Sequence, residues 1–86
     1  MNTRTYRVRS GADLGRIVRD ARTAQGLTQA EAVEHLELAF DRTRLARIEA
    51  GEGMQSLDRV LSVLRRFGVE VTATVPVASP VPDGQP

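Results

Sequence analysis

The side chains that most often perform chemistry in enzymes are few in this sequence of 86 residues. His35 is the only histidine, the chain has no cysteine, and no carboxylate cluster surrounds His35 at metal-ligand spacing. Ser10 and Ser56 each precede a helical pattern, so they are interpreted as helix N-caps rather than as nucleophiles. We therefore predict no catalytic residue, no metal site and no cofactor.

Two other polar clusters also fit structural roles better than catalytic ones. Glu31, Glu34 and Glu37 follow one another at intervals of three, which is typical of a solvated helix face rather than of an acid/base pair. The segment 51–53, Gly-Glu-Gly, follows a helical pattern and lacks the lysine and hydroxyl residue of a phosphate loop. An enzyme is therefore not indicated.

The arginines carry the main functional signal. The chain has 12 basic and 11 acidic residues, and every basic residue is arginine. Three of them (Arg42, Arg44 and Arg47) fall within six residues that contain no acid. Guanidinium groups bind phosphate and base edges bidentately, so this spacing is typical of a helix that reads DNA. An arginine-biased coding sequence and a merely solvated face are the alternatives.

Apolar periodicity and capping residues predict the elements that would position these arginines. A helix begins after Ser10 and ends before Gly26, and Gly15 within it indicates a close approach by a neighbouring element. Thr28 and Glu31 form a capping-box pattern for the next helix. The remaining predicted elements are helices at 29–37, 42–50 and 57–67, and a strand with period-two alternation at 69–75. Asp41 is the predicted N-cap of the helix at 42–50.

Length and composition limit the kind of protein. A chain this short with three aromatic residues has a small core, so a partner subunit is expected to add stability. No apolar run approaches the roughly 20 residues of a membrane span, and we expect a soluble cytoplasmic protein without membrane contact. Residues 1–9 are interpreted as an arm, 10–68 as the main domain, 69–75 as a dimerisation strand and 76–86 as a disordered proline-rich tail.

Two motifs resemble the phage-repressor (Cro/CI, or XRE) class of helix-turn-helix proteins. They are Gly-Leu-Thr-Gln-Ala-Glu at 26–31 and Leu-x-x-Ile-Glu-x-Gly at 45–51, within a resemblance that covers about residues 12–67. The resemblance implies a mainly α fold, a lambda-repressor-like domain of four to five helices with one C-terminal strand that pairs across a dimer. Because a strand directly follows the last helix, the chain is most similar in this class to the HipB-type antitoxins.

The resemblance also implies roles for residues at matching positions. Gln29 corresponds to a glutamine that contacts phosphate, at a helix N-terminus that favours anions. Arg42, Thr43 and Arg47 correspond to the positions that read base edges in the major groove, where arginine favours guanine. Arg44 is expected to contact phosphate.

Two further features bear on how the third helix is held. Arg22 and Glu49 match a pair that forms a buried structural salt bridge between the first and third helices in this class. Between Gln29 and Leu45 the chain is about two residues longer than the common pattern, and the turn glycine is absent. Either the second helix is extended by half a turn or the turn has a different shape.

The predicted strand 69–75 suggests how a dimer could form. One face carries Val69, Val71, Ala73 and Val75, and antiparallel pairing with the same strand of a second copy would satisfy one edge of each strand. This apolar face would then cover the fourth helices of both subunits. The alternative is pairing within one chain, with the arm around Tyr6–Arg9.

These observations together predict a homodimeric, sequence-specific DNA-binding repressor that binds a palindromic double-stranded operator. The HipB-type resemblance implies that it autoregulates a HipBA-like toxin–antitoxin operon and neutralises a HipA-like kinase toxin. One alternative is a stand-alone XRE regulator without a toxin. Another is a protein-interaction adaptor that does not bind DNA, in which apolar or acidic residues would be expected at the groove-facing positions.

Overall fold

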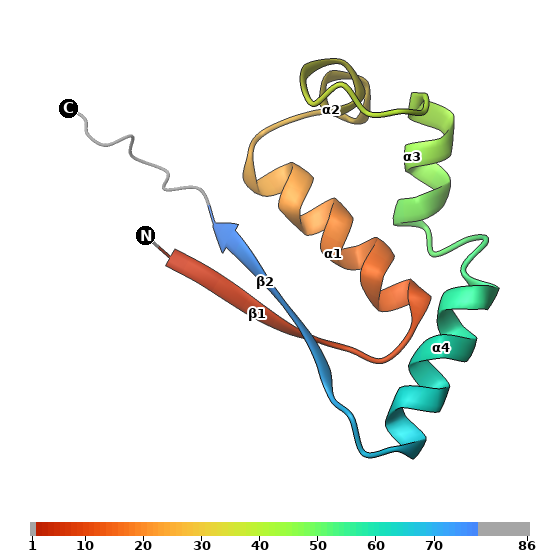
Figure 1. Ribbon diagram of the computed structural model, residues 1–86. Helices are drawn as coiled ribbons and strands as arrows, with labels where there is room; N and C mark the ends of the chain where they lie inside the picture. The colour runs from red at the N-terminus through yellow and green to blue at the C-terminus, as the bar shows by residue number, and fades with distance from the viewer. Residues whose placement is uncertain (1, 78–86) are drawn as a thin grey trace.

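The structure is a computed structural model that describes residues 2–77, and this part of the chain folds into four helices and two strands (Figure 1). The predicted disordered tail 76–86 is wrong for its first two residues, which belong to the last strand, and from position 78 onward it lies outside the described residues. In chain order the elements are β1 (Asn2–Val8), α1 (Gly11–Ala24), α2 (Gln29–His35), α3 (Arg42–Glu49), α4 (Gln55–Arg66) and β2 (Val71–Val77). The four predicted helices are confirmed.

The first three helices begin where their capping residues predict. The side chains of Ser10, Thr28 and Asp41 each accept a hydrogen bond from the backbone N–H three residues further on, at 3.0–3.2 Å. Glu31 completes the capping box by accepting from the Thr28 backbone N–H at 2.8 Å. Each cap satisfies a helical N–H group that has no partner within its own helix, which fixes where α1, α2 and α3 start.

The start of α4 corrects the prediction that Ser56 caps this helix. The helix begins at Gln55, and no side chain caps its N-terminus. The Met54 carbonyl already accepts from the Asp58 backbone N–H at 2.8 Å, which places Ser56 inside the first helical turn. The Asp58 carboxylate accepts instead from the Gly11 backbone N–H at 2.6 Å, so this side chain joins α4 to the start of α1.

The N-terminal segment is a strand rather than an unpaired arm. β1 pairs antiparallel with β2 of the same chain, in a register that runs from Asn2 opposite Val77 to Val8 opposite Val71. Pairing within one chain was the alternative in the sequence analysis. The prediction missed β1 because arginines interrupt its alternation of threonine, tyrosine and valine, all residues that favour strands. The Tyr6 hydroxyl also donates to Asp20 on α1 at 2.7 Å, which fastens β1 to that helix.

The C-terminal strand begins two residues later than the predicted range 69–75. Gly68 ends α4 in the left-handed region at φ 77°, and the Val69 backbone N–H still bonds to the last turn of that helix. Val75 is buried, Val71 and Ala73 are half-buried, and β2 packs on α1 of its own chain. This corrects the expectation that the valine face covers two fourth helices, and it leaves Val69 exposed.

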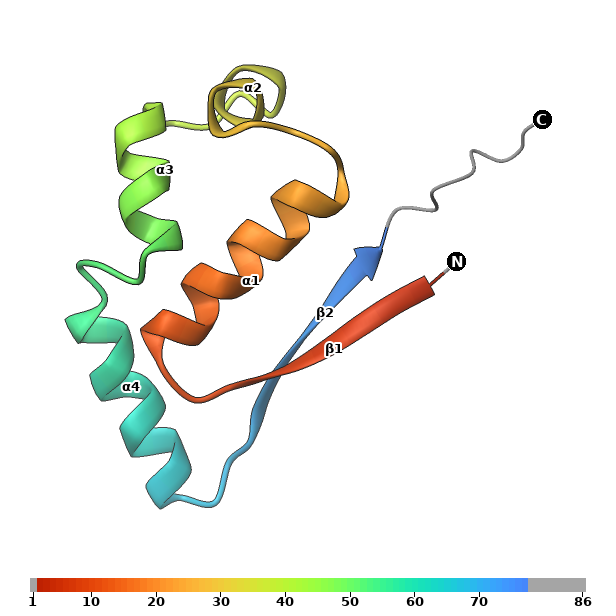
Figure 2. The same ribbon diagram turned by 180° about the vertical axis from the view of Figure 1, so that it is seen from behind.

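The helix α1 lies at the centre of the arrangement. The β1–β2 ribbon runs along one side of α1 and α3 packs on the other, while α4 contacts α1 only near its start (Figures 1 and 2). The core is small: no large side chain is fully buried in residues 2–77, and no helix there is long and apolar enough to cross a membrane. The buried apolar residues are Val8, Ala32, Leu45, Leu61 and Val75.

Candidate nucleic-acid interface

The exposed side of α3 carries several guanidinium groups, whereas Glu49, the carboxylate of this helix, is turned inward. Arg42, Thr43, Arg44 and Arg47 are all exposed, whereas Leu45 is buried in the core. The helix therefore has one side fixed by packing and one side free to meet a ligand. Exposed guanidinium groups in a helical array can donate bidentately to phosphate oxygens or to the O6 and N7 acceptors of guanine.

Glycines allow the end of α3 to approach α1 closely. A Cβ atom added at Gly15 would collide with the backbone carbonyl oxygen of Ile48 and would lie 3.1 Å from that of Glu49. Gly51, at φ 78°, lies in a similar way against the Ala12 backbone. Gly15 is therefore explained by the close approach that the sequence analysis expected. This contact fixes the C-terminal end of α3 on α1.

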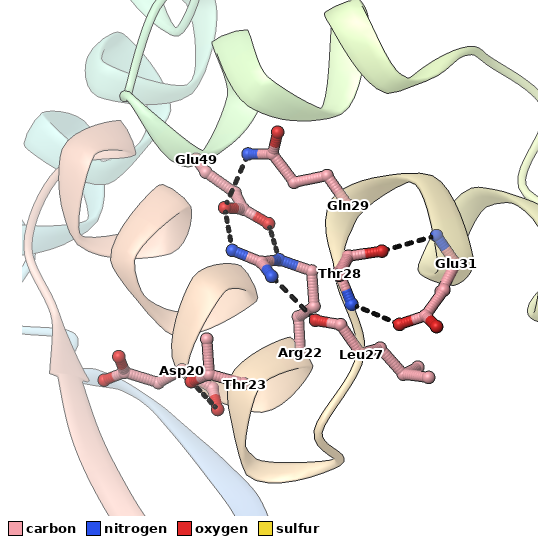
Figure 3. Close-up of polar contacts among 8 residues, drawn as sticks. All are labelled: Asp20, Arg22, Thr23, Leu27, Thr28, Gln29, Glu31 and Glu49. Atoms are coloured by element: carbon pink, nitrogen blue, oxygen red, sulfur yellow. Dashed lines mark hydrogen bonds and ion pairs between the residues drawn. The ribbon is translucent and has the colours of Figure 1, made fainter.

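An ion pair joins α1 to α3 beside this contact (Figure 3). The Arg22 Nε and Nη2 atoms donate to the two carboxylate oxygens of Glu49 at 2.7 and 2.9 Å, and Nη1 donates to the Leu27 carbonyl at 2.7 Å. The Glu49 side chain is only 5% exposed. The structure thus brings together Arg22 and Glu49 in a bidentate pair that also ties down the segment before α2.

The electrostatic environment of this pair favours its charged form. The Arg22 hydrogen bonds lower the pKa of the Glu49 carboxyl from its ordinary value of 4.5, against the opposing effect of desolvation, and the Gln29 hydrogen bond adds to the lowering. The same hydrogen bonds raise the pKa of Arg22. At neutral pH the carboxylate therefore stays ionised although little water reaches it.

Gln29 begins α2 and reaches toward the same pair. Its Nε2 atom donates to Glu49 at 3.1 Å, and its side chain is half-buried (Figure 3). The resemblance implies that Gln29 contacts phosphate. In the structure the Gln29 amide completes the shell around the Glu49 carboxylate, which links α2 to the base of α3.

The turn between α2 and α3 resolves the choice left open by its extra length. α2 ends at His35, short of the predicted position 37, so the helix is not extended and the turn has a different shape. Glu37 adopts φ 51°, in the left-handed region where a glycine usually stands. The Leu38 backbone N–H then bonds back to the Val33 carbonyl at 3.1 Å, which closes α2.

A carboxylate that the sequence reasoning missed lies beside one of the exposed arginines. Glu52 accepts from the Arg47 Nε atom at 3.1 Å, and both side chains are more than half exposed. The i,i+5 spacing across Gly51 is outside the helical i,i+3 and i,i+4 rules, so no standard pattern signals it. This bond engages the Nε–H group of the Arg47 guanidinium.

The side chains considered for other chemistry do not assemble. Ser10 caps α1, Ser56 lies in the first turn of α4, and His35 is exposed at the end of α2. Within residues 2–77, no group of three or more histidine, aspartate or glutamate side chains is placed to hold a metal ion. The α3 surface is therefore the candidate site that the described part of the chain offers.

Comparison with known proteins agrees with this arrangement. A family described as "Helix-turn-helix domain" matches residues 13–75, which include most of α1, all of α2, α3 and α4, and most of β2. No curated protein and no solved structure matches the chain significantly. The matched region contains the capped second and third helices and spans well over half of the sequence. The chain therefore belongs to the helix-turn-helix domain family.

Proposed function

We propose that the protein is a sequence-specific transcriptional repressor that places α3 in the major groove of a palindromic operator and binds as a homodimer. The observation that carries this proposal is the exposed arginine surface of α3 on a helix whose other side is fixed to α1 by the Arg22–Glu49 pair. A DNA-reading helix needs both properties, because its side chains must be free and its axis must be held.

The roles of individual side chains follow from their positions on α3. Arg42 and Thr43 lie in its first turn, and Arg47 lies about one turn further along, so that all three reach base edges. Arg44 is assigned to a phosphate. Gln29 is also assigned to a phosphate, and we propose that its amide exchanges the Glu49 oxygen for a phosphate oxygen when DNA binds.

Selection from a random duplex library tests this function and identifies the operator sequence in the same experiment. The parent protein should enrich one palindromic motif, whereas Arg42→Ala and Arg47→Ala should each relax the preference at one base pair. Arg59→Ala, which removes an exposed arginine from α4, is the matched control and should enrich the parental motif. Failure of the parent to enrich any motif would favour the adaptor function, and an unchanged motif in both α3 variants would contradict the base-reading roles.

The antitoxin role is the narrower proposal. It is supported by the resemblance to HipB-type proteins, in which a strand follows the helix-turn-helix region, and it adds autoregulation of the operon and neutralisation of a HipA-like kinase. Coexpression with the kinase-like product of an adjacent reading frame is the test. Growth arrest by the kinase that the parent relieves would support the role. Absence of such a frame, or unrelieved arrest, would favour a stand-alone regulator.

A further inference from the structure

Two polar side chains and one buried leucine hold α4 against its own chain. The Asp58 carboxylate accepts from the Gly11 backbone N–H, and the Arg65 guanidinium donates to the Arg9 carbonyl. These two residues are seven positions apart, so they lie on the same side of the helix. Between them Leu61 is the only residue of α4 that is buried. The side of α4 that faces the rest of the chain therefore has few apolar contacts.

The side of α4 that faces away is apolar. The exposed fractions are 44% for Leu57, 55% for Val60, 53% for Val63 and 79% for Phe67, and Val69 beyond the helix is 44% exposed. The helical residues follow one another at spacings of three and four, which places them in one continuous stripe. We refer to these five residues as the α4 stripe. The apolar side of a surface helix usually packs on its own core, whereas in α4 the core takes Leu61 and the stripe stays exposed.

The area of the α4 stripe is large for so small a chain. Scaling typical side-chain areas by the exposed fractions gives roughly 450 Å² of apolar surface, within the range of about 300–600 Å² that the largest patch on a monomeric protein covers. Two such stripes in contact would bury about 900 Å² before any flanking residue is counted, which approaches the roughly 1,200 Å² of a small specific interface. A second copy of the chain thus supplies enough apolar area to cover the stripe.

We propose that α4 pairs with α4 of a second copy, antiparallel about a two-fold axis, through the α4 stripe. In this arrangement Leu57 of one protomer meets Phe67 of the other, and Val60 and Val63 lie near the axis. The stripe contains no charged side chain, so it meets its own copy without like charges at the centre. The proposal rests on the homodimer of the proposed function and is an alternative to the expected β2–β2 contact, for which one edge of β2 remains because β1 occupies the other.

Sedimentation velocity in the absence of DNA tests the pairing. The parent should sediment as a dimer, and Val60→Glu and Phe67→Glu should each weaken the dimer at least about 100-fold, because each would bury an unpaired carboxylate. Both side chains are exposed in the single chain, so the helical circular dichroism should be retained. Arg59→Glu, which changes the charge outside the stripe on the same helix, should remain dimeric. A monomeric parent, or a dimeric Val60→Glu with retained helicity, would overturn the proposal.

Oxidative cross-linking locates the contact directly because the chain has no cysteine of its own. Val63→Cys, near the proposed axis, should give a covalent dimer, whereas Thr72→Cys on the exposed side of β2 should not. Cross-linking through Thr72→Cys alone would overturn the α4 contact in favour of strand pairing.

Titration on a duplex with one half-site keeps this proposal separate from DNA binding. Val60→Glu should bind the half-site duplex with the affinity of the parent, but its affinity should not rise when the duplex carries a second half-site. A rise in affinity as large as that of the parent would count against the α4 contact. Failure of the parent protein to bind the half-site duplex would instead contradict the proposed DNA-binding function.

Discussion

The two ends of the molecule are held together in different ways. In the α1–α2–α3 unit, each helix has a side-chain N-cap, the bidentate Arg22–Glu49 pair joins two helices, and glycine lets α3 approach α1 closely. The α4 end has no N-cap, attaches to α1 through Asp58, and exposes the α4 stripe. The first unit joins its helices through polar contacts and exposes Leu36 and Phe40, whereas the α4 end leaves the whole α4 stripe uncovered.

This difference fits the two proposed tasks of the chain, DNA reading by α3 and pairing through α4. A base-reading helix must keep its axis fixed, which the contacts around α3 provide within one protomer. A dimer contact must instead keep apolar surface free until the second copy binds. The contrast predicts that stability changes will be large at the α1–α3 junction and small at exposed contacts of the other end.

Removal of Arg22 should give the largest effect. Arg22→Met would leave the Glu49 carboxylate, 5% exposed, without its cation, and we expect a loss of about 3–5 kcal/mol in the free energy of unfolding. Glu70→Gln is the matched control, because it breaks an ion pair with Arg7 in which both side chains are more than half exposed. That change should cost less than about 1 kcal/mol. Urea titrations followed by circular dichroism would measure both, and equal losses would contradict the contrast.

Gly15→Ala should have the next largest effect. The added methyl group would collide with the Ile48 carbonyl, and overpacking of this kind costs about 1–3 kcal/mol. Because α3 must move away from α1, DNA binding should also weaken. Thr23→Ala, on an exposed position of the same helix, should change the free energy of unfolding by less than about 0.5 kcal/mol. A thermal melt of Gly15→Ala identical to that of the parent would refute the close approach.

The Glu49 carboxylate should make stability depend on acid pH. Its pKa in the folded chain is below the ordinary value of 4.5, so its contribution is present above that pH and is lost as the pH falls through the folded pKa. Urea midpoints between pH 7 and pH 3 should therefore fall more steeply for the parent than for Glu49→Gln. The urea midpoint of Glu49→Gln should still fall somewhat with pH, because the Thr28 backbone hydrogen bond also lowers the pKa of Glu31. Parallel curves for parent and variant would contradict this role.

The smallest stability change is expected at the turn between α2 and α3. Glu37 adopts φ 51°, a backbone region in which a non-glycine residue costs about 1–2 kcal/mol. Glycine avoids this cost, but its greater entropy in the unfolded chain cancels part of the gain. Glu37→Gly should raise the free energy of unfolding by up to about 1 kcal/mol. Glu34→Gly, inside α2, should lower it by a similar amount. A lower melting temperature for Glu37→Gly would show that the turn has another conformation in solution.

Local signals explain what the sequence could predict. Ser10, Thr28 and Asp41 cap helices through atoms three residues away, so each of these helix starts is encoded within one turn. The arginines of α3 were found from their spacing in a segment without acid, and Arg22 and Glu49 from the motif resemblance. The structure brings that pair together.

Non-local contacts explain what the sequence could not predict. The pairing of β1 with β2 joins the two ends of the described chain, and no residue pattern within residues 2–8 specifies that partner. Ser56 was misjudged as a cap because the contact of Asp58 with Gly11 lies 47 residues away in sequence. The exposure of the α4 stripe likewise depends on which side of α4 meets residues 9–11, since periodicity shows that a helix has an apolar side but not what covers it.

The most direct measurement of the central account, that α3 reads DNA sequence, is the affinity ratio between a selected operator and a scrambled duplex of the same length. Fluorescence anisotropy at fixed salt would give this ratio for the parent, Arg47→Ala, Gln29→Ala and the control Arg59→Ala. We predict that Arg47→Ala lowers the ratio by about 5- to 150-fold, equivalent to about 1–3 kcal/mol, and that Gln29→Ala weakens binding to both duplexes alike. Arg59→Ala should leave the ratio unchanged. An Arg47→Ala protein with the parental ratio would contradict the account.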